Sequence, residues 1–182
     1  EYFLFWGSIE PKKNIGRMIE AYLASGVNAP LVIVGAQAWK SKQELRLLEA
    51  GGASLYDAGA VSRRGIIRLS YVPFGLLVSL IRGAKAALFP SLYEGFGLPA
   101  LEAMLLGTPV ICSDSSSLPE VAGDAALMVD PYSAAAITEA IRRIDADAGL
   151  REELSTRGLR QAAKFSPEVY RDRLTTLYQR FS

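Results

Sequence analysis

Two carboxylates, Glu94 and Glu102, are the residues of this sequence best suited to chemistry, and seven residues separate them. Glu94 lies in a turn, residues 94–97, and Glu102 lies one turn into a helix expected at about 98–106. Leucines flank Glu102 in the sequence, so a surface salt bridge is not its easiest explanation. A carboxylate held beside apolar neighbours needs hydrogen-bond donors, and sugar hydroxyls supply them. The two carboxylates therefore indicate a polyol ligand.

The turn before this helix predicts a second kind of contact. At the start of the expected helix, the backbone N–H groups of Phe96, Gly97 and Leu98 have no partner within the helix. Such a cluster of N–H donors suits a phosphate and repels a carboxylate that has no cationic or hydroxyl partner. Together, the turn and the two carboxylates could hold a molecule that carries both a phosphate and a polyol.

A strand, a turn, a helix and a second strand position these residues. The apolar run Ala86–Phe89 fits a strand that is buried on both faces, and Pro90 ends it. Gly107 ends the helix, and a second apolar run, Pro109–Cys112, gives the next strand. The turn therefore lies at the carboxyl end of a strand, where parallel α/β sheets bind ligands.

Strands and helices alternate through the whole chain, which is typical of an α/β protein. We expect a single domain with a Rossmann-like three-layer sandwich and a mostly parallel sheet of about six strands. Asn14 is expected to cap the helix that follows it, and the serines at 113–117 to cap a short helix at 118–121. The other expected strands are 2–6, 31–34, 66–69 and 126–129, and the other expected helices are about 15–23, 41–50, 76–83, 134–144 and two within 150–182.

The segments 94–104, 107–110 and 118–123 resemble the donor-binding half of family 4 (group 1) retaining glycosyltransferases. The resemblance extends through most of the chain. It implies the GT-B fold, in which two Rossmann-like halves enclose the reaction and the acceptor half precedes the donor half. Residues 1–182 would then be the donor-binding domain, with the N-terminal acceptor domain absent from this chain. A strand begins at once after Glu1, which suggests a piece of a longer protein.

The resemblance also implies roles for the residues of the turn. Glu94 would hold hydroxyls of the donated sugar, and Glu102 would hold the ribose hydroxyls. Residues 95–98 would bind the donor through their backbone N–H groups. Glycine at Gly95 and Gly97 would let the main chain come close to the ligand.

Two other segments match the family's pattern in part. Lys13 matches a basic residue that in the family approaches the donor's diphosphate. Ser8 occupies the family's first basic position and is not basic, and the neighbouring Lys12 is interpreted as a solvated lysine. Tyr71 and Val72 follow the third strand, where the family meets the nucleobase largely through backbone groups. The expected site is completed by Ser8, Lys13, Tyr71 and Val72. Lys12 is not part of it.

The reaction that the resemblance implies is transfer of a hexose from a nucleoside-diphosphate sugar to a glycan or lipid-linked acceptor, with retained anomeric configuration. Glu94 and Lys13 would be the catalytic residues, because Lys13 and the N–H groups can offset charge on the departing diphosphate without a metal. We therefore expect no cofactor and no metal. The loop at 10–14 is similar to that of mannosyl-transferring members. The chain alone is expected to be inactive, since the acceptor would bind through the missing N-terminal domain.

The bulk composition argues against several other classes of protein. With 20 basic and 19 acidic residues, the net charge is +1, which does not favour a nucleic-acid partner. The chain has no His, which excludes His-based triads and His metal sites within it. Its single Cys, Cys112, falls in a predicted buried strand. Asp145 and Asp147 resemble an Asp-x-Asp metal motif, but a solvated turn between helices is the preferred interpretation, and no metal is assigned.

No apolar run in the sequence is long enough to span a membrane. We expect a cytoplasmic location, with at most peripheral contact at the inner face of the membrane. Two alternatives remain open for the function. One is another enzyme of the same architecture, a sugar-nucleotide epimerase or a phosphorylase. The other is a non-catalytic module that binds a nucleotide sugar and has lost its partner half.

Overall fold

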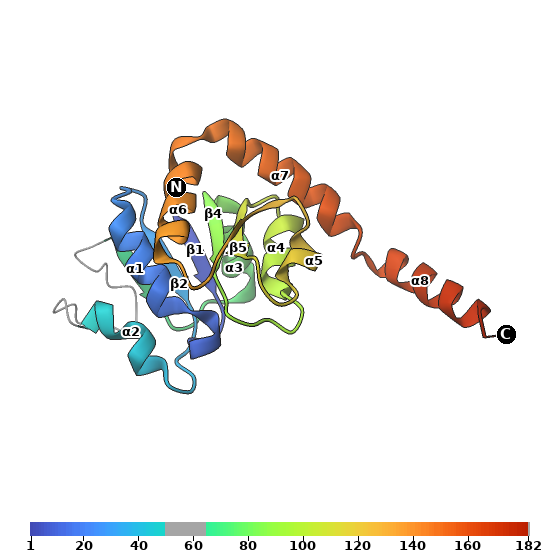
Figure 1. Cartoon of the computed structure of the whole chain (residues 1–182), viewed down its shortest axis with the longest axis horizontal. Helices are drawn as coiled ribbons and strands as arrows, with labels where there is room; N and C mark the ends of the chain where they lie inside the picture. The colour runs from blue at the N-terminus through green and yellow to red at the C-terminus, as the bar shows by residue number, and fades with distance from the viewer. Residues whose placement is uncertain (50–64, 182) are drawn as a thin grey trace.

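A parallel sheet of six strands forms the centre of the computed structural model, which describes residues 1–49 and 65–181 (Figure 1). The order of the strands is β3-β2-β1-β4-β5-β6, and every neighbouring pair is parallel. The prediction of a Rossmann-like α/β domain with about six strands is therefore confirmed. The strands are β1 (Phe3–Trp6), β2 (Leu31–Val34), β3 (Ile66–Leu69), β4 (Ala86–Phe89), β5 (Val110–Ser113) and β6 (Ala126–Val129).

Helices cover both faces of this sheet. In one layer α1 packs against α2 and α6, and in the other α4 packs against α5 and α7. The helix expected at 41–50 is observed to Glu49, and residue 50 lies outside the described residues. The helical elements are the 3-10 helix η1 (Pro11–Lys13), α1 (Ile15–Ser25), α2 (Ser41–Glu49), α3 (Phe74–Gly83), α4 (Leu98–Leu105), α5 (Leu118–Ala122), α6 (Ala134–Ala146), α7 (Ala148–Ala163) and α8 (Pro167–Gln179).

The core lies along the four inner strands. All residues of β1, β2, β4 and β5 are buried, because helices lie over both faces of the sheet there. The edge strands β3 and β6 are mostly half-buried. This explains why the inner strands appear in the sequence as continuous apolar runs without alternation.

The chain changes direction across the sheet between β1 and β4. From β1 it adds β2 and β3 on one side, and it then returns to place β4 on the other side of β1. Between β1 and β4, only the first half of each strand is paired, Phe3 with Ala86 and Leu4 with Ala87. The ring of Trp6 lies edge-on to that of Phe89, with centroids 4.8 Å apart. Ligands of open α/β sheets bind at such a switch point, outside the carboxyl ends of the two strands.

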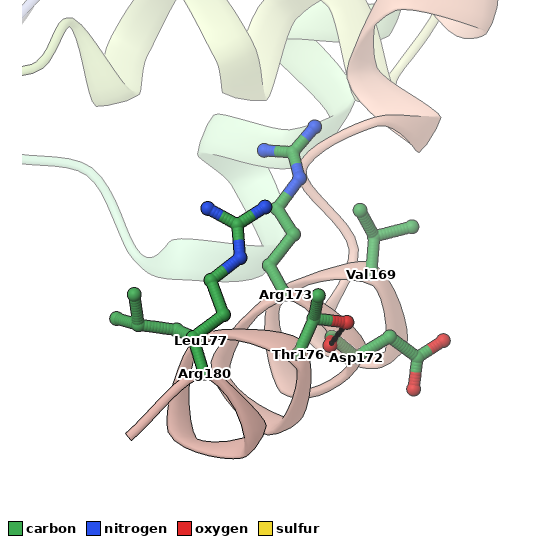
Figure 2. Close-up of a pocket in the computed structure, with 6 residues that line it drawn as sticks. All are labelled: Val169, Asp172, Arg173, Thr176, Leu177 and Arg180. Atoms are coloured by element: carbon green, nitrogen blue, oxygen red, sulfur yellow. Dashed lines mark hydrogen bonds between the residues drawn. The ribbon is translucent and has the colours of Figure 1, made fainter.

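The last helix, α8, extends away from the sheet and its covering helices (Figure 1). It has no buried residue, although Ser166 caps it by accepting a hydrogen bond from the Val169 N–H at 3.3 Å. Figure 2 shows a shallow hollow along this helix, with two arginines on one side of it. The hollow is lined by Val169, Asp172, Arg173, Thr176, Leu177 and Arg180.

The two aspartates of the Asp-x-Asp sequence serve the structure around α6 and α7. Asp145 accepts a hydrogen bond from Lys85 Nζ at 2.8 Å, and Asp147 caps α7 through the Leu150 N–H at 2.9 Å. Burial lowers the pKa of Lys85, but hydrogen bonds to Asp145 and Glu1 outweigh this effect and hold the pKa above its ordinary value. No group of three or more metal-binding side chains occurs in the described parts, 1–49 and 65–181. Within the same residues, no helix is long and apolar enough to cross a membrane.

Candidate functional site

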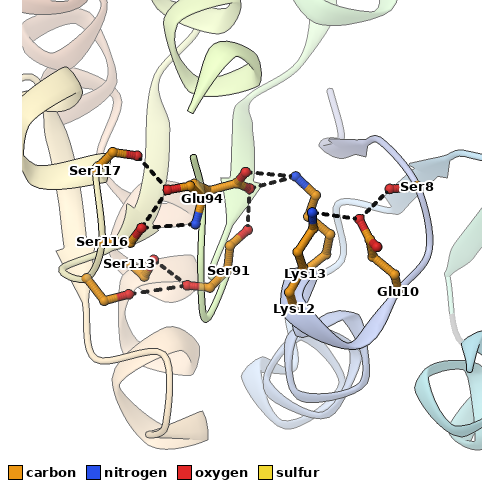
Figure 3. Close-up of polar contacts among 10 residues, drawn as sticks. Ser8, Glu10, Lys12, Lys13, Ser91, Glu94, Ser113, Ser116 and Ser117 are labelled. Atoms are coloured by element: carbon orange, nitrogen blue, oxygen red, sulfur yellow. Dashed lines mark hydrogen bonds and ion pairs between the residues drawn. The ribbon is translucent and has the colours of Figure 1, made fainter. Parts of the chain in front are cut away.

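Lys13 and Glu94 form an ion pair at the switch point between β1 and β4 (Figure 3). Lys13 ends η1 in the loop after β1, and Glu94 lies in the loop after β4. Lys13 Nζ donates to both carboxylate oxygens of Glu94, at 2.7 and 2.9 Å. Only 12% of the lysine side chain and 9% of the glutamate side chain are exposed. The sequence placed both residues in one site but gave no sign that they bind each other.

Serines hold Glu94 in place from two loops (Figure 3). Ser91 Oγ donates to Glu94 Oε1 at 2.8 Å. The Glu94 N–H donates to Ser116 Oγ at 3.1 Å, and the same hydroxyl donates back to the Glu94 carbonyl at 2.6 Å. Ser117 Oγ donates to that carbonyl as well, at 3.0 Å. Both the main chain and the carboxylate of Glu94 are therefore fixed, and none of these serines was predicted as a site residue.

The expectation that the serines at 113–117 cap α5 is wrong. Ser117 is the N-cap residue of α5, but its side chain makes no capping hydrogen bond. Its backbone is helical (φ −83°, ψ −11°) instead of extended, so the hydroxyl is not directed over the first turn. The hydroxyls instead donate to carbonyls of the β4–α4 loop, including Ser113 Oγ to the Ser91 carbonyl at 2.6 Å. This loop between β5 and α5 thus supports the loop that carries Glu94.

The side chain of Asn14 does not cap α1, contrary to prediction. Its backbone is left-handed (φ 59°), and the buried carboxamide faces neighbouring loops. Nδ2 donates to the carbonyls of Pro90 at 2.9 Å and Pro131 at 2.7 Å, and Oδ1 accepts from Arg17 Nη1 at 2.9 Å. Asn14 therefore joins the loops after β1, β4 and β6 directly beside Lys13.

The turn before α4 presents free backbone donors. Within residues 1–49 and 65–181, no acceptor pairs with the N–H groups of residues 95–98. Gly97 has φ of 101°, and a Cβ there would lie 2.8 Å from a methyl group of Leu118. Gly95 has open space around it, because a Cβ added there would meet no atom within 4 Å beyond its chain neighbours. The structure thus requires glycine at 97, leaves approach to residue 95 unobstructed, and offers donors suited to an anion.

Glu102 also reaches the switch point, but its surroundings differ from the expected ones. Trp6, the last residue of β1, donates from Nε1 to Glu102 Oε2 at 3.1 Å. The expectation that apolar neighbours hold Glu102 is wrong, because it lies on an exposed face of α4 with Leu98 and Leu105, which are 58% and 55% exposed. Its other oxygen accepts no hydrogen bond from the described residues. Trp6 was not predicted as a site residue, and only its position at the end of a buried strand could have indicated it.

Ser8 is engaged with its own loop. Its hydroxyl donates to Glu10 Oε1 at 2.7 Å, and Lys12 Nζ lies 3.4 Å from the same oxygen (Figure 3). The hydrogen bond from Ser8 holds the pKa of the Glu10 carboxyl below its ordinary value, and the charge of Lys12 adds to this. Lys12 and Lys13 therefore point to different carboxylates, as expected for adjacent side chains.

Tyr71, Val72 and Phe96 are the remaining predicted residues. Tyr71 and Val72 follow β3, which is separated from β1 by β2. Tyr71 is 81% exposed, and Val72 packs partly against the core. Phe96 lies edge-on to Phe165, with ring centroids 5.8 Å apart. The structure brings Lys13, the turn and both carboxylates to the switch point and leaves Tyr71 and Val72 farther along the sheet.

The only cysteine of the chain is not a nucleophile candidate. Cys112 is fully buried in β5. Burial raises the pKa of its thiol to about 12, so the thiol stays protonated at neutral pH.

Comparison with known proteins identifies the family. Residues 1–161 match the family model described as glycosyl transferases group 1. The chain belongs to this family. Among relatives, an O-antigen chain mannosyltransferase B of Escherichia coli is 41% identical over 172 residues, which cover 92% of this chain and 42% of the relative. A serotype-specific mannosyltransferase WbdA of the same species is 34% identical over 168 residues, 91% of this chain and 20% of the relative.

Solved structures of similar fold include two proteins named as sugar-phosphate synthases. Sucrose-phosphate synthase from Thermosynechococcus elongatus has a TM-score of 0.77 and 27% identity, covering 100% of this chain and 45% of that one. A trehalose-phosphate synthase from Burkholderia vietnamiensis has a TM-score of 0.78 and 17% identity over 97% of this chain and 44% of that one, a likeness of fold alone. This group 1 glycosyltransferase chain thus spans less than half the length of these relatives. The names of the relatives do not favour an epimerase or a phosphorylase.

Proposed function

We propose that the chain is the donor-binding domain of a hexosyltransferase and binds a nucleoside-diphosphate sugar at the switch point. The observation that carries the proposal is the set of unpaired N–H groups at 95–98, directly beside the ion pair of Lys13 and Glu94. The N–H groups and Lys13 bind the diphosphate. Glu94 accepts hydrogen bonds from hydroxyls of the sugar, and the exposed oxygen of Glu102 accepts from the ribose.

In the proposed reaction the donor's sugar passes to a hydroxyl of a glycan or lipid-linked acceptor. The bond from C1 to the diphosphate oxygen breaks, a bond from C1 to the acceptor oxygen forms, and the acceptor's proton leaves with the diphosphate. Charge grows on the diphosphate as the bond breaks. We propose that Lys13 and the N–H groups stabilise that charge by several kcal/mol once the acceptor domain encloses the site and excludes water. We propose that the reaction retains the anomeric configuration and requires no metal or other cofactor.

Mannose is the sugar that the relatives favour, because two of them are named mannosyltransferases. The acceptor is proposed to bind through an N-terminal domain that this chain does not contain, which agrees with its covering only 42% of the Escherichia coli O-antigen relative. That relative also favours a role in polysaccharide biosynthesis. Tyr71 and Val72 are proposed to meet the nucleobase, and Ser8 to lie near the phosphates. The cytoplasmic location remains an expectation.

A binding screen tests the proposal. GDP-, UDP- and ADP-sugars are titrated calorimetrically into the 182-residue chain and into three variants, Lys13→Ala, Glu102→Ala and Lys12→Ala. Loss of a charged hydrogen bond to phosphate should weaken binding by about tenfold or more in Lys13→Ala. Glu102→Ala should weaken nucleotide and sugar nucleotide to a similar degree, because the ribose is common to both.

Lys12→Ala is the matched control. Its side chain is 51% exposed and pairs with Glu10, so its removal should change the affinity by less than about twofold. Equal binding by the parent and all three variants would contradict the site. A full-length enzyme that binds the sugar nucleotide and transfers nothing to any hydroxyl acceptor would instead favour the non-catalytic module.

A further inference from the structure

Two side chains that the proposed function assigns to different parts of the donor bind each other in the structure. Lys13, proposed for the diphosphate, and Glu94, proposed for the sugar, are bound by two hydrogen bonds of 2.7 and 2.9 Å. Both side chains are about nine-tenths buried. Each side chain must leave this ion pair before it can bind a ligand fully. Opening the pair is strongly disfavoured unless the ligand replaces the lost partner, because a buried charge would otherwise be left alone.

The lysine is the partner free to move. Three serines fix Glu94, with Ser91 on its carboxylate and Ser116 and Ser117 on its main chain. Within the described residues, Glu94 is the only partner of Lys13 Nζ, and the ammonium sits on a flexible four-carbon side chain. A phosphate near residues 95–98 would therefore draw Lys13 away while Glu94 stays in place.

We propose that the Lys13–Glu94 ion pair makes this site prefer the intact sugar nucleotide to the nucleoside diphosphate that the reaction leaves behind. The inference rests on the proposed function. The intact donor compensates both residues, because its phosphates replace Glu94 at Lys13 and its sugar hydroxyls replace Lys13 at Glu94. The diphosphate alone compensates only Lys13. It leaves Glu94 buried with the single hydroxyl of Ser91, so the ion pair re-forms and the product is released.

The test compares affinities for the nucleoside diphosphate and its sugar form, using the base that binds best in the screen above. Glu94→Gln keeps the size of the side chain and an oxygen for Ser91, but it releases Lys13. The diphosphate should then bind about tenfold more tightly than to the parent protein. The sugar nucleotide gains less, because a neutral amide is a weaker acceptor for hydroxyls. The preference for the intact donor should therefore fall by about tenfold.

A double-mutant cycle separates this exchange from simple repulsion between a carboxylate and a phosphate. In a Lys13→Met background, Glu94→Gln should change the affinity for the diphosphate by less than about twofold, because there is no lysine to release. An equal gain in both backgrounds would show that the glutamate acts on the phosphate directly and would overturn the inference. Lys12→Ala is the matched control, since it removes the neighbouring cation, which pairs with Glu10 instead of Glu94, and it should leave the diphosphate affinity within about twofold.

The outcomes of these titrations distinguish failure of the inference from failure of the proposed function. If the parent chain binds none of the nucleotides, the proposed function fails and the inference fails with it. If the parent binds them and Glu94→Gln leaves the diphosphate affinity unchanged or lower, only the inference fails. Circular dichroism establishes that the variants fold. Should Glu94→Gln not fold, Glu94→Asp keeps the charge, moves it away from Lys13, and should tighten diphosphate binding about threefold; an unchanged affinity there overturns the inference equally.

Discussion

Asn14 joins three loops at the candidate site. Replacing it should therefore lower the free energy of unfolding far more than the small size of its side chain suggests. In Asn14→Ala, the buried carbonyl of Pro90 loses its donor, at a cost of about 2 kcal/mol. The carbonyl of Pro131 loses one of two donors, since Arg17 still binds it at 3.0 Å, at a cost of about 1 kcal/mol. Alanine at φ 59° adds about 1 kcal/mol of backbone strain, which asparagine tolerates better. The total is about 4 kcal/mol.

Glycine separates these effects, because Asn14→Gly loses the same hydrogen bonds without the strain and should be destabilised by only about 3 kcal/mol. Urea unfolding followed by circular dichroism measures both losses, and the midpoint of thermal unfolding should fall by about 8–16 °C for the alanine variant. Asn28, the other asparagine, is exposed and makes no hydrogen bond through its side chain in the described structure, so Asn28→Ala should change stability by less than about 0.5 kcal/mol. A loss below about 1 kcal/mol in Asn14→Ala, or a glycine variant no more stable than the alanine variant, would refute this reasoning.

Three further predictions concern the turn, the buried thiol and turnover. Gly97→Ala should weaken sugar-nucleotide binding by about tenfold or more and lower the free energy of unfolding, because φ of 101° and the methyl group of Leu118 force the turn to shift. Gly95→Ala should leave the free energy of unfolding almost unchanged, because its added Cβ would meet no protein atom within 4 Å beyond its chain neighbours. Since burial raises the pKa of Cys112 to about 12, its stabilising contribution is complete below about pH 9 and is lost as the pH rises toward 12. Between about pH 8 and pH 10.5 the parent should lose about 2 kcal/mol more in urea unfolding than Cys112→Ala, and equal losses would contradict the burial effect. The chain alone should bind a sugar nucleotide and transfer no sugar, so a robust transfer rate from it would oppose the two-domain proposal.

The strands could be predicted because each is a short apolar run with a clear stop. Leu31–Val34 ends at Gly35, and Ala86–Phe89 ends at Pro90. The start of α3 was placed two residues late, at Leu76, although the helix begins at Phe74 directly after Pro73. Local signals such as these decide where elements lie, and the rule for parallel sheets then gives the edge at which ligands bind.

The contacts inside the site could not be predicted, because they join distant parts of the chain. Glu94 binds Lys13 from 81 positions away, and Trp6 reaches Glu102 across 96. A serine before a helix has two uses, capping that helix or binding a neighbouring loop, and its sequence position is the same in both. Ser116 follows the second use because its own backbone is left-handed (φ 59°) and its hydroxyl meets the main chain of Glu94. Residue types thus indicated the chemistry, while the paths of the loops determined the partners.

The central position of β1 has a consequence for biosynthesis. Of the six strands, β1 leaves the ribosome first, and β2 pairs with one of its edges early. Its second edge has no partner until β4 has been made, after the whole segment that forms β3 and α3. Through that interval a nascent chain displays the aromatic run Phe3–Trp6 with an open edge, which is a site for aggregation. Production of this protein should therefore depend on chaperones that shield early segments until the second half of the sheet has emerged.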